Sequence, residues 1–255
     1  MIALSYGGGT NSAAMLVGMN ELGIRPDHIT FADTGAEKPH TYKHIEIIDK
    51  WLIEIGFPSI TVVNQLKRDG TLNQLEQLCL DNNMLPSIAY GYKSCSLKHK
   101  VAPQDKFFNN LDDAKEIWNT GESIIKYIGY DADEHHRVKF HKSEDGKYIY
   151  QYPLIEWNWG RDECINAIIR AGLPLPGKSA CFFCPSSKKQ EILQLKKDYP
   201  ELAERAIIME KNAHLTSVKG LGRNFAWSDL YLADENQGKL FCESNIEIDC
   251  GCYDG

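Results

Sequence analysis

Three consecutive glycines near the N-terminus constrain the fold of this chain more than any other feature. A short apolar run, Ile2-Ala3-Leu4-Ser5-Tyr6, precedes them and predicts a β-strand. Apolar residues at helical spacing follow as far as Leu22, and Asn11 or Ser12 is expected to cap that helix. A glycine loop between a strand and a helix turns backbone N–H groups toward an anion, beside the positive helix end. The pattern therefore predicts a phosphate site, although the Walker spacing is absent.

Strands and helices alternate beyond this loop. The apolar segments 28–32 and 59–63 predict strands, and residues 39–55 place apolar side chains at helical spacing between them. A further strand is predicted over 123–130, a hairpin over 141–150, and irregular structure from Leu215 onward. This order predicts an α/β fold with a doubly wound, mostly parallel sheet.

The length and the cysteine pattern suggest two parts. We expect a nucleotide-binding α/β domain over residues 1–155. A smaller helical C-terminal subdomain over 156–255, carrying a Cys-x-x-Cys and a Cys-x-Cys, is expected to pack on the sheet. No low-complexity linker separates the two parts, so a tethered second domain is not expected.

Charge and hydropathy exclude some classes of protein. The formal net charge of −7 argues against a general polyanion binder, although residues 93–106 hold a local basic stretch. No apolar run approaches the roughly 20 residues that span a bilayer, and the chain runs from Met1 directly into its first strand. We therefore expect a cytoplasmic protein without a signal peptide or a membrane partner.

Eight cysteines in such a chain indicate metal binding or catalysis before disulfides. Cys181 and Cys184 have the spacing of a chelating pair. Cys250 and Cys252 could complete a Cys₄ zinc site with that pair. Alternatively, Cys95 and one C-terminal cysteine could join the pair around a [4Fe–4S] cluster. Spacing alone does not separate these two soft-ligand sites. The other three, Cys79, Cys164 and Cys242, are expected to be buried thiols.

The N-terminal loop resembles the pyrophosphate loop of the PP-loop ATP pyrophosphatases, SGGxDS. Gly7 stands where that motif has Ser, and Asn11 stands where it has Asp, which weakens a role for Asn11 in holding Mg²⁺. The resemblance implies contacts with ATP from the residues Ser5, Gly7, Gly8, Gly9, Thr10, Asn11 and Ser12.

Three further segments resemble the phosphoadenosine phosphosulfate (PAPS) reductase branch of that superfamily, in the family's order. Asp33-Thr34-Gly35 resembles its second-strand motif, which implies that Asp33 and Thr34 contact the nucleotide. The segment 94–103 resembles Cys-Cys-x-x-Arg-Lys-x-x-Pro, with a single cysteine, Cys95. The segment 129–137 resembles Gly-Ile-Arg-x-x-Glu-Ser-x-x-Arg and matches it at Glu134 and Arg137. Asp131 replaces the early arginine, which binds substrate phosphate in the reductases.

These resemblances imply an adenine nucleotide alpha hydrolase-like fold and an ATP pyrophosphatase that uses Mg²⁺. ATP would adenylate an acceptor in nucleic acid, as in DNA phosphorothioate modification or tRNA thiolation, for sulfur transfer. The catalytic residues would be Asp33, Glu134 and Arg137, while Lys98, Lys100 and Arg137 would position acceptor phosphates. A cysteine desulfurase or another donor protein would supply the sulfur, and a homodimer is possible. The alternative is a sulfonucleotide reductase. For the metal, the match of Cys95 to a cluster-ligand position favours the iron–sulfur cluster over zinc.

Overall fold

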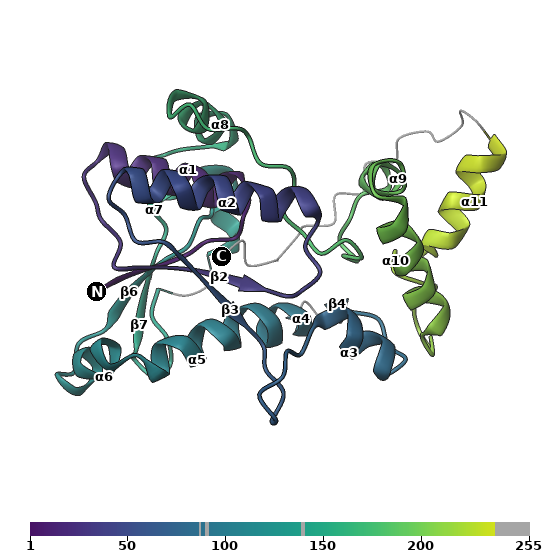
Figure 1. Cartoon of the computed structure of the whole chain (residues 1–255), viewed down its shortest axis with the longest axis horizontal. Coiled ribbons are helices and arrows are strands. Elements are labelled where there is room, and N and C mark those ends of the chain that lie inside the picture. Colours follow the sequence, from purple (N-terminus) through teal and green to yellow (C-terminus); the bar gives the residue numbers. More distant parts are fainter. Residues whose placement is uncertain (87, 90–91, 139–140, 238–255) are drawn as a thin grey trace.

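A five-stranded parallel sheet organises the protein, in the order β3-β2-β1-β6-β7 (Figure 1). The computed structural model describes residues 1–86, 88–89, 92–138 and 141–237. The strands of the sheet are β1 (Ile2–Ser5), β2 (His28–Asp33), β3 (Ile60–Asn64), β6 (Ile124–Tyr127) and β7 (Tyr148–Gln151). A separate antiparallel pair is formed by β4 (Ile88–Ala89) and β5 (Tyr92–Lys93). The parallel α/β fold predicted from the sequence is confirmed.

Helices cover both faces of this sheet (Figure 1). One layer holds α1 (Thr10–Glu21), α2 (Pro39–Glu54), α7 (Pro153–Glu156) and α8 (Arg161–Arg170). The opposite layer holds α3 (Leu75–Asp81), α4 (Ser94–Ser96), the π-helical turn η1 (Leu97–Val101), α5 (Ala102–Asn110) and α6 (Asp112–Asn119). Beyond one end of the sheet lie α9 (Lys189–Asp198), α10 (Pro200–Asn212) and α11 (Trp227–Gln237). The 3₁₀ helix η2 (Ala132–Arg137) follows β6.

Several hydrophobic clusters pack these groups of helices, and two of the clusters are the largest. In the first, Leu4 and Ile29 of the sheet pack with residues of α1 and α2 and with Ile168 of α8. In the second, α3 packs with α9, α10 and α11 around Phe182 and Phe183. The segment that carries Cys181 therefore lies between the sheet and the C-terminal helices. The domain boundary expected after residue 155 stays a prediction.

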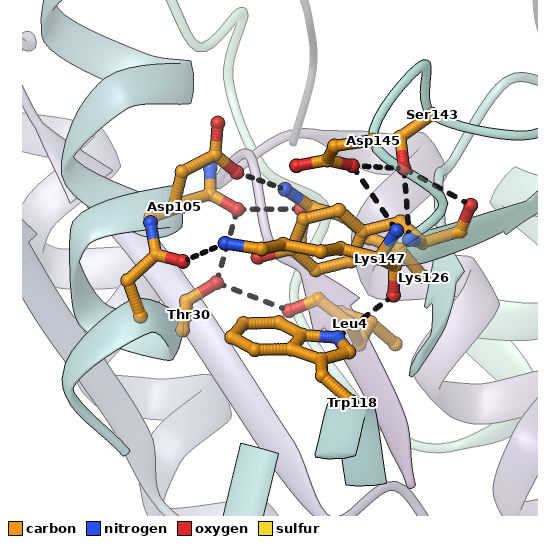
Figure 2. Close-up of polar contacts among 12 residues, drawn as sticks. Leu4, Thr30, Asp105, Trp118, Lys126, Ser143, Asp145 and Lys147 are labelled. Carbon is orange, nitrogen blue, oxygen red and sulfur yellow. Dashed lines mark hydrogen bonds and ion pairs between the residues drawn. The ribbon is translucent and has the colours of Figure 1, made fainter. Parts of the chain in front are cut away.

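Polar contacts fix α5 beneath the sheet (Figure 2). Lys126 of β6 is almost fully buried, and its Nζ lies 3.6 Å from the Asp105 carboxylate of α5. Burial lowers the pKa of this lysine, and Asp105 opposes that shift. The neighbouring Gln104 accepts hydrogen bonds from Ser5 (2.6 Å) and Thr30 (3.1 Å). Three strands thus anchor the helix that continues from the Cys95 segment.

The structure corrects three local predictions. Gly9, rather than Asn11 or Ser12, is the N-cap of α1, because Ser12 already lies inside the helix and Asn11 bonds elsewhere. The segment 141–150 does form an antiparallel contact, Lys142 with Ile149, but β7 also joins the sheet parallel to β6. Helix α11 replaces part of the irregular structure expected after Leu215. Trp227, Leu230 and Tyr231 give it a buried apolar face at helical spacing.

Candidate nucleotide site and cysteine pocket

The glycine loop lies where the strand order of the sheet reverses. β1 has β2 on one side and β6 on the other. The chain continues from β1 toward β2 and from β6 toward β7, which lie in opposite directions along the sheet. Such a switch point is where open parallel sheets bind ligands. The two loops approach closely at Gly129, where an added Cβ would lie 3.2 Å from the backbone nitrogen of Ser12. Glycine at this position lets the β6 loop reach the first turn of α1.

The loop backbone has the conformation and the surroundings of a close-approach site. Gly8 has a φ of +75°, and a Cβ there would lie 2.9 Å from Cγ2 of Thr41. Gly9 then starts α1, and no side chain in the described parts of the chain caps that helix. The first N–H groups of a helix have no intrahelical acceptor, and they carry the positive end of its dipole. An anion at this loop would find backbone donors, as the sequence predicted.

Asn11 connects the loop to the segment after β6. Its side-chain nitrogen donates to Asp131 (3.0 Å) and to Glu134 (3.0 Å). Its side-chain oxygen accepts a 3.1 Å hydrogen bond from the Arg161 guanidinium at the start of α8. Burial raises the pKa of Asp131, and the Asn11 hydrogen bond opposes this. Asn11 therefore joins three elements through a side chain that is itself buried.

The predicted catalytic residues come from two elements, η2 and the end of β2. Arg137 is buried, donates to Glu134 at 2.5 Å, and places its guanidinium 4.2 Å from the centre of the Tyr130 ring. Asp33 ends β2 and accepts hydrogen bonds from the Gly35 backbone and the Tyr42 hydroxyl, both at 2.8 Å. Glu134 thus contacts the loop residue Asn11 directly, whereas Asp33 lies at the end of the adjacent strand.

Three of the predicted metal ligands share a pocket. Cys95, Cys181 and Cys184 line it together, with Thr34 at its wall. The Thr34 hydroxyl lies 3.2 Å from the Cys181 sulfur. Backbone contacts hold the Cys181 segment to the turn after β2, through a bridge between Glu37 and Cys181. Cys95 and Cys181 are 86 positions apart in the sequence, and only the resemblance of the Cys95 segment to a cluster-ligand position had suggested grouping them.

Ser179 links this pocket to the glycine loop. Its hydroxyl donates to the Gly7 carbonyl at 2.5 Å and lies 3.4 Å from a carboxylate oxygen of Glu37. Glu37 is buried and forms an ion pair with Lys100 at 3.5 Å. Burial and the Glu37 carboxylate both raise the pKa of the Cys181 thiol, while Lys100 lowers it. The glycine loop and the cysteine pocket are therefore neighbours, and Ser179 contacts both.

The thiols are not arranged as a preformed metal site. Among the described residues, no three His, Cys, Asp or Glu side chains come close enough together to hold one metal ion. Cys250 and Cys252, like Cys242, lie outside the described residues, so their predicted role stays a prediction. Cys79 and Cys164 are buried, as expected. The donor set fits a soft metal or cluster in kind, because three thiols face one pocket.

The two lysines predicted to position an acceptor differ in their surroundings. Lys98 is exposed, whereas Lys100 is engaged with Glu37 inside the cysteine pocket. Sequence reasoning missed three residues of the site, namely Ser179, Glu37 and Arg161. Glu37 follows the Asp33-Thr34-Gly35 turn and Ser179 precedes the Cys-x-x-Cys, so proximity to a motif was the available signal. Nothing local marks Arg161, which is 150 positions from Asn11.

Comparisons with known proteins find similarity to solved structures alone. No protein-family model matches the chain, and a search of curated proteins finds no match. Among solved structures, the chain is similar to the U34-tRNA thiolase NcsA from Methanococcus maripaludis, determined with its [4Fe–4S] cluster. The identity is 15%, the alignment covers 94% of this chain and 82% of that chain, and the TM-score is 0.38. A similarity this low does not carry a function, which is inferred below from the residues of this chain.

None of the helices in the described part of the chain is both long enough and apolar enough to cross a membrane.

Proposed function

We propose that this protein cleaves ATP to AMP and pyrophosphate, and so adenylates an acceptor for sulfur transfer. One observation carries the proposal: Ser179 joins the glycine loop to a pocket lined by three cysteines. A phosphate-binding loop supplies nucleotide chemistry, and a cluster of thiols supplies sulfur or soft-metal chemistry. Their contact within one fold favours a reaction that uses both.

The glycine loop supports the first half of this reaction. An acceptor oxygen attacks the α-phosphorus of ATP, the bond to the β-phosphate oxygen breaks, and pyrophosphate leaves. Backbone N–H groups at the start of α1 would stabilise the charge that develops on the leaving pyrophosphate. The N-cap of the helix is Gly9, directly after Gly8, and the helix begins at Thr10. Mg²⁺ bound to the phosphates would add to this stabilisation when present.

The carboxylates near the loop are the proposed catalytic groups. Asp33 lies at the carboxyl end of β2, where its orientation is fixed by Gly35 and Tyr42. Glu134 is fixed by Asn11 and Arg137. Oxygen ligands of this kind suit Mg²⁺, which prefers one or two carboxylates together with phosphates and water. We propose that Asp33 and Glu134 orient the ATP–Mg²⁺ complex, with Arg137 holding Glu134 in place.

The cysteine pocket supports the second half. A sulfur nucleophile attacks the adenylated carbon or phosphorus atom of the acceptor, and AMP leaves with the electron pair of the broken bond. We propose that Cys95, Cys181 and Cys184 hold a [4Fe–4S] cluster, which when bound would present sulfur at an open iron. Zinc is the alternative occupant of the same thiols. The residues of this chain place those thiols beside Thr34, at the end of the strand next to the loop.

We further propose a nucleic acid as the acceptor and a cysteine desulfurase as the sulfur donor. Lys98 is exposed on the basic stretch beside the pocket, which suits a phosphate contact. The sulfonucleotide reductase alternative is disfavoured by Asp131. Its carboxylate, bonded to Asn11, occupies the position at which the reductase motif has a phosphate-binding arginine.

The products of ATP cleavage test the proposal. Purified protein is incubated with α-labelled ATP and Mg²⁺, with and without single-stranded nucleic acid, and the products are separated. We expect AMP and pyrophosphate, with the rate rising when acceptor is present. ADP as the sole product would contradict the proposal. Sulfite formed from PAPS and a thiol reductant would instead establish the reductase activity.

A further inference from the structure

A second cavity lies beside η2, the short helix whose Glu134 contacts the glycine loop. Its volume is about 500 Å³, within the range of roughly 300–1,000 Å³ typical of ligand pockets. The wall is formed by η2, by β7 and by the end of α7, and its lining is mostly apolar and aromatic. Members of that lining include His135, His141, Ile149, Tyr150, Gln151 and Tyr152.

Aromatic rings are organised around this cavity. Tyr152 stacks on Tyr130, with centroids 5.6 Å apart and planes within 13°. Arg137 covers Tyr130, and His141 meets Tyr152 edge-on at 6.0 Å. The Arg137 guanidinium and the Tyr152 ring thus both pack against Tyr130, within a small buried cluster of hydrophobic residues. Planar side chains in such an arrangement are the groups with which proteins stack nucleobases.

The same short helix serves the cavity and the glycine loop. Glu134 of η2 contacts Asn11 of the loop, and the next residue, His135, lines the cavity. A group bound in the cavity would therefore lie against the same short helix that contacts the glycine loop. Such proximity suits the acceptor of the adenylation, which must meet the α-phosphate.

We propose that this cavity binds an unpaired nucleobase of the acceptor strand. The proposal rests on the function proposed above, and it names the part of the acceptor that the protein recognises. The base stacks with the tyrosine and histidine rings, while the Gln151 amide and the Glu156 carboxylate at the cavity offer partners for its edge. Exposed His136 and Lys142 lie on the adjoining segments, where they meet the strand's phosphates.

The matched pair Ile149→Glu and Ile169→Glu tests the site. Ile149 lines the cavity and is 39% exposed, whereas Ile169 lies on α8 and is 56% exposed. The two changes add the same charge to exposed positions. Fluorescence anisotropy with labelled single-stranded DNA and RNA of one sequence measures binding. We expect Ile149→Glu to weaken binding of the better strand at least tenfold, and Ile169→Glu to leave it within twofold.

Two further arms locate the contact and identify the ligand. A strand carrying 5-iodouracil is cross-linked by light, and we expect adducts on peptides containing Tyr150 or Tyr152. An otherwise identical strand with an abasic site at that position should bind more weakly. Equal binding of the abasic strand, cross-links confined to other peptides, or equal effects of the two glutamates would overturn the proposal.

Nucleotide binding separates this proposal from the proposed function. ATP affinity is measured for both variants by calorimetry, and we expect it to equal that of the unmodified protein. If the protein neither binds nor cleaves ATP, the proposed adenylation is contradicted, but binding of the nucleobase in the cavity can still be measured. Cleavage of ATP by a protein whose cavity takes no base would remove only the present proposal.

Discussion

The Asn11 side chain donates a 3.0 Å hydrogen bond to the carboxylate of Asp131, across 120 positions of sequence. These two residues are also the positions at which the loop and the β6 segment depart from the motifs they resemble. Asn11 replaces an aspartate and Asp131 replaces an arginine. In the structure the two departures form one contact, so an amide and a carboxylate meet where the motifs have a carboxylate and a guanidinium.

Asn11→Asp should therefore impair the protein rather than restore the usual motif. The new carboxylate would face Asp131 and Glu134, each now 3.0 Å from the Asn11 amide nitrogen. Repulsion and a lost donor should lower the free energy of unfolding by on the order of 1–3 kcal/mol. The double variant Asn11→Asp/Asp131→Asn regains a donor and an acceptor and should recover part of the loss. The coupling is measured by urea unfolding of the unmodified protein, the single variants Asn11→Asp and Asp131→Asn, and the double variant. Strictly additive changes in the free energy of unfolding would contradict the contact.

Gly8→Ala should abolish ATP binding, and Gly23→Ala is its matched control. Both glycines have positive φ, +75° and +68°, so alanine is strained by about 1–2 kcal/mol at either position. Only at Gly8 does the new Cβ meet another atom, Thr41 Cγ2 at 2.9 Å, while nothing lies within 4 Å at Gly23. A somewhat lower melting temperature for Gly8→Ala than for Gly23→Ala is expected, with ATP affinity lost only in Gly8→Ala, both measured by calorimetry. Unchanged affinity would place the nucleotide elsewhere.

Ser179→Ala should weaken ATP binding more than it weakens the fold. The serine hydroxyl donates to the Gly7 carbonyl, and Ser123 makes an equivalent bond of 2.7 Å to the Gly146 carbonyl far from the site. Ser179→Ala and the control variant Ser123→Ala should each lower the free energy of unfolding by about 1 kcal/mol. Only Ser179→Ala should raise the Kd for ATP, by roughly threefold to tenfold. Equal Kd values for the two variants would show that this serine does not support the loop.

Cys181→Ser should abolish the proposed metal binding, whereas Cys164→Ala should keep it. Cys181 lines the pocket with Cys95 and Cys184, while Cys164 is a buried residue of α8 in the first core. Protein purified without oxygen is assayed for iron, sulfide and zinc, and its absorption spectrum is recorded. Iron and sulfide with a brown chromophore are expected, and both should be lost in Cys181→Ser. Stoichiometric zinc would identify the pocket as a structural zinc site. Metal retained in Cys181→Ser would exclude this thiol as a ligand.

Stability should fall as the pH drops below the ordinary histidine pKa of about 6.5. Burial lowers the pKa of His44, which is bonded to Tyr6 and to the Pro174 carbonyl. Above pH 6.5 both the folded and unfolded states hold this ring neutral, so it adds no pH dependence. Below it, the unfolded chain takes up the proton first, and folding becomes less favourable. His44→Gln should lower stability at pH 8 but flatten the decline toward pH 5.5, measured by urea unfolding. An unchanged slope would assign the decline to other groups.

The sequence predicted those parts of the fold that local patterns specify. Glycines after an apolar strand predicted the loop at Gly8, and alternating elements predicted the parallel sheet. Helix α11 was missed although Trp227, Leu230 and Tyr231 have helical spacing, because the surrounding glycines suggested an irregular segment. Periodicity reports which side of an element is buried, and it is weakened by neighbouring turn residues.

The polar connections of the site were beyond prediction for a different reason. Ser179 reaches Gly7 across 172 positions, and Arg161 reaches Asn11 across 150. Such contacts depend on the angle at which a helix or loop packs on the sheet, which no local pattern encodes. The resemblance to a superfamily predicted that Cys95 would lie near Cys181 and Cys184. It did not indicate which serine, carboxylate or arginine would join them to the loop.

The π-helical turn over Leu97–Val101 has a consequence for the thiol that precedes it. Such a turn holds one residue more than a regular α-helical turn, and each residue advances the helix by about 100°. If the same residues wound as a regular α-helix, Cys95 would rotate by roughly that angle relative to the anchored helix α5. The thiol would leave the side facing Cys181. The π-helical turn therefore sets the register between Cys95 and Gln104, and a sequence with one residue fewer and a regular helix there would keep the same pocket.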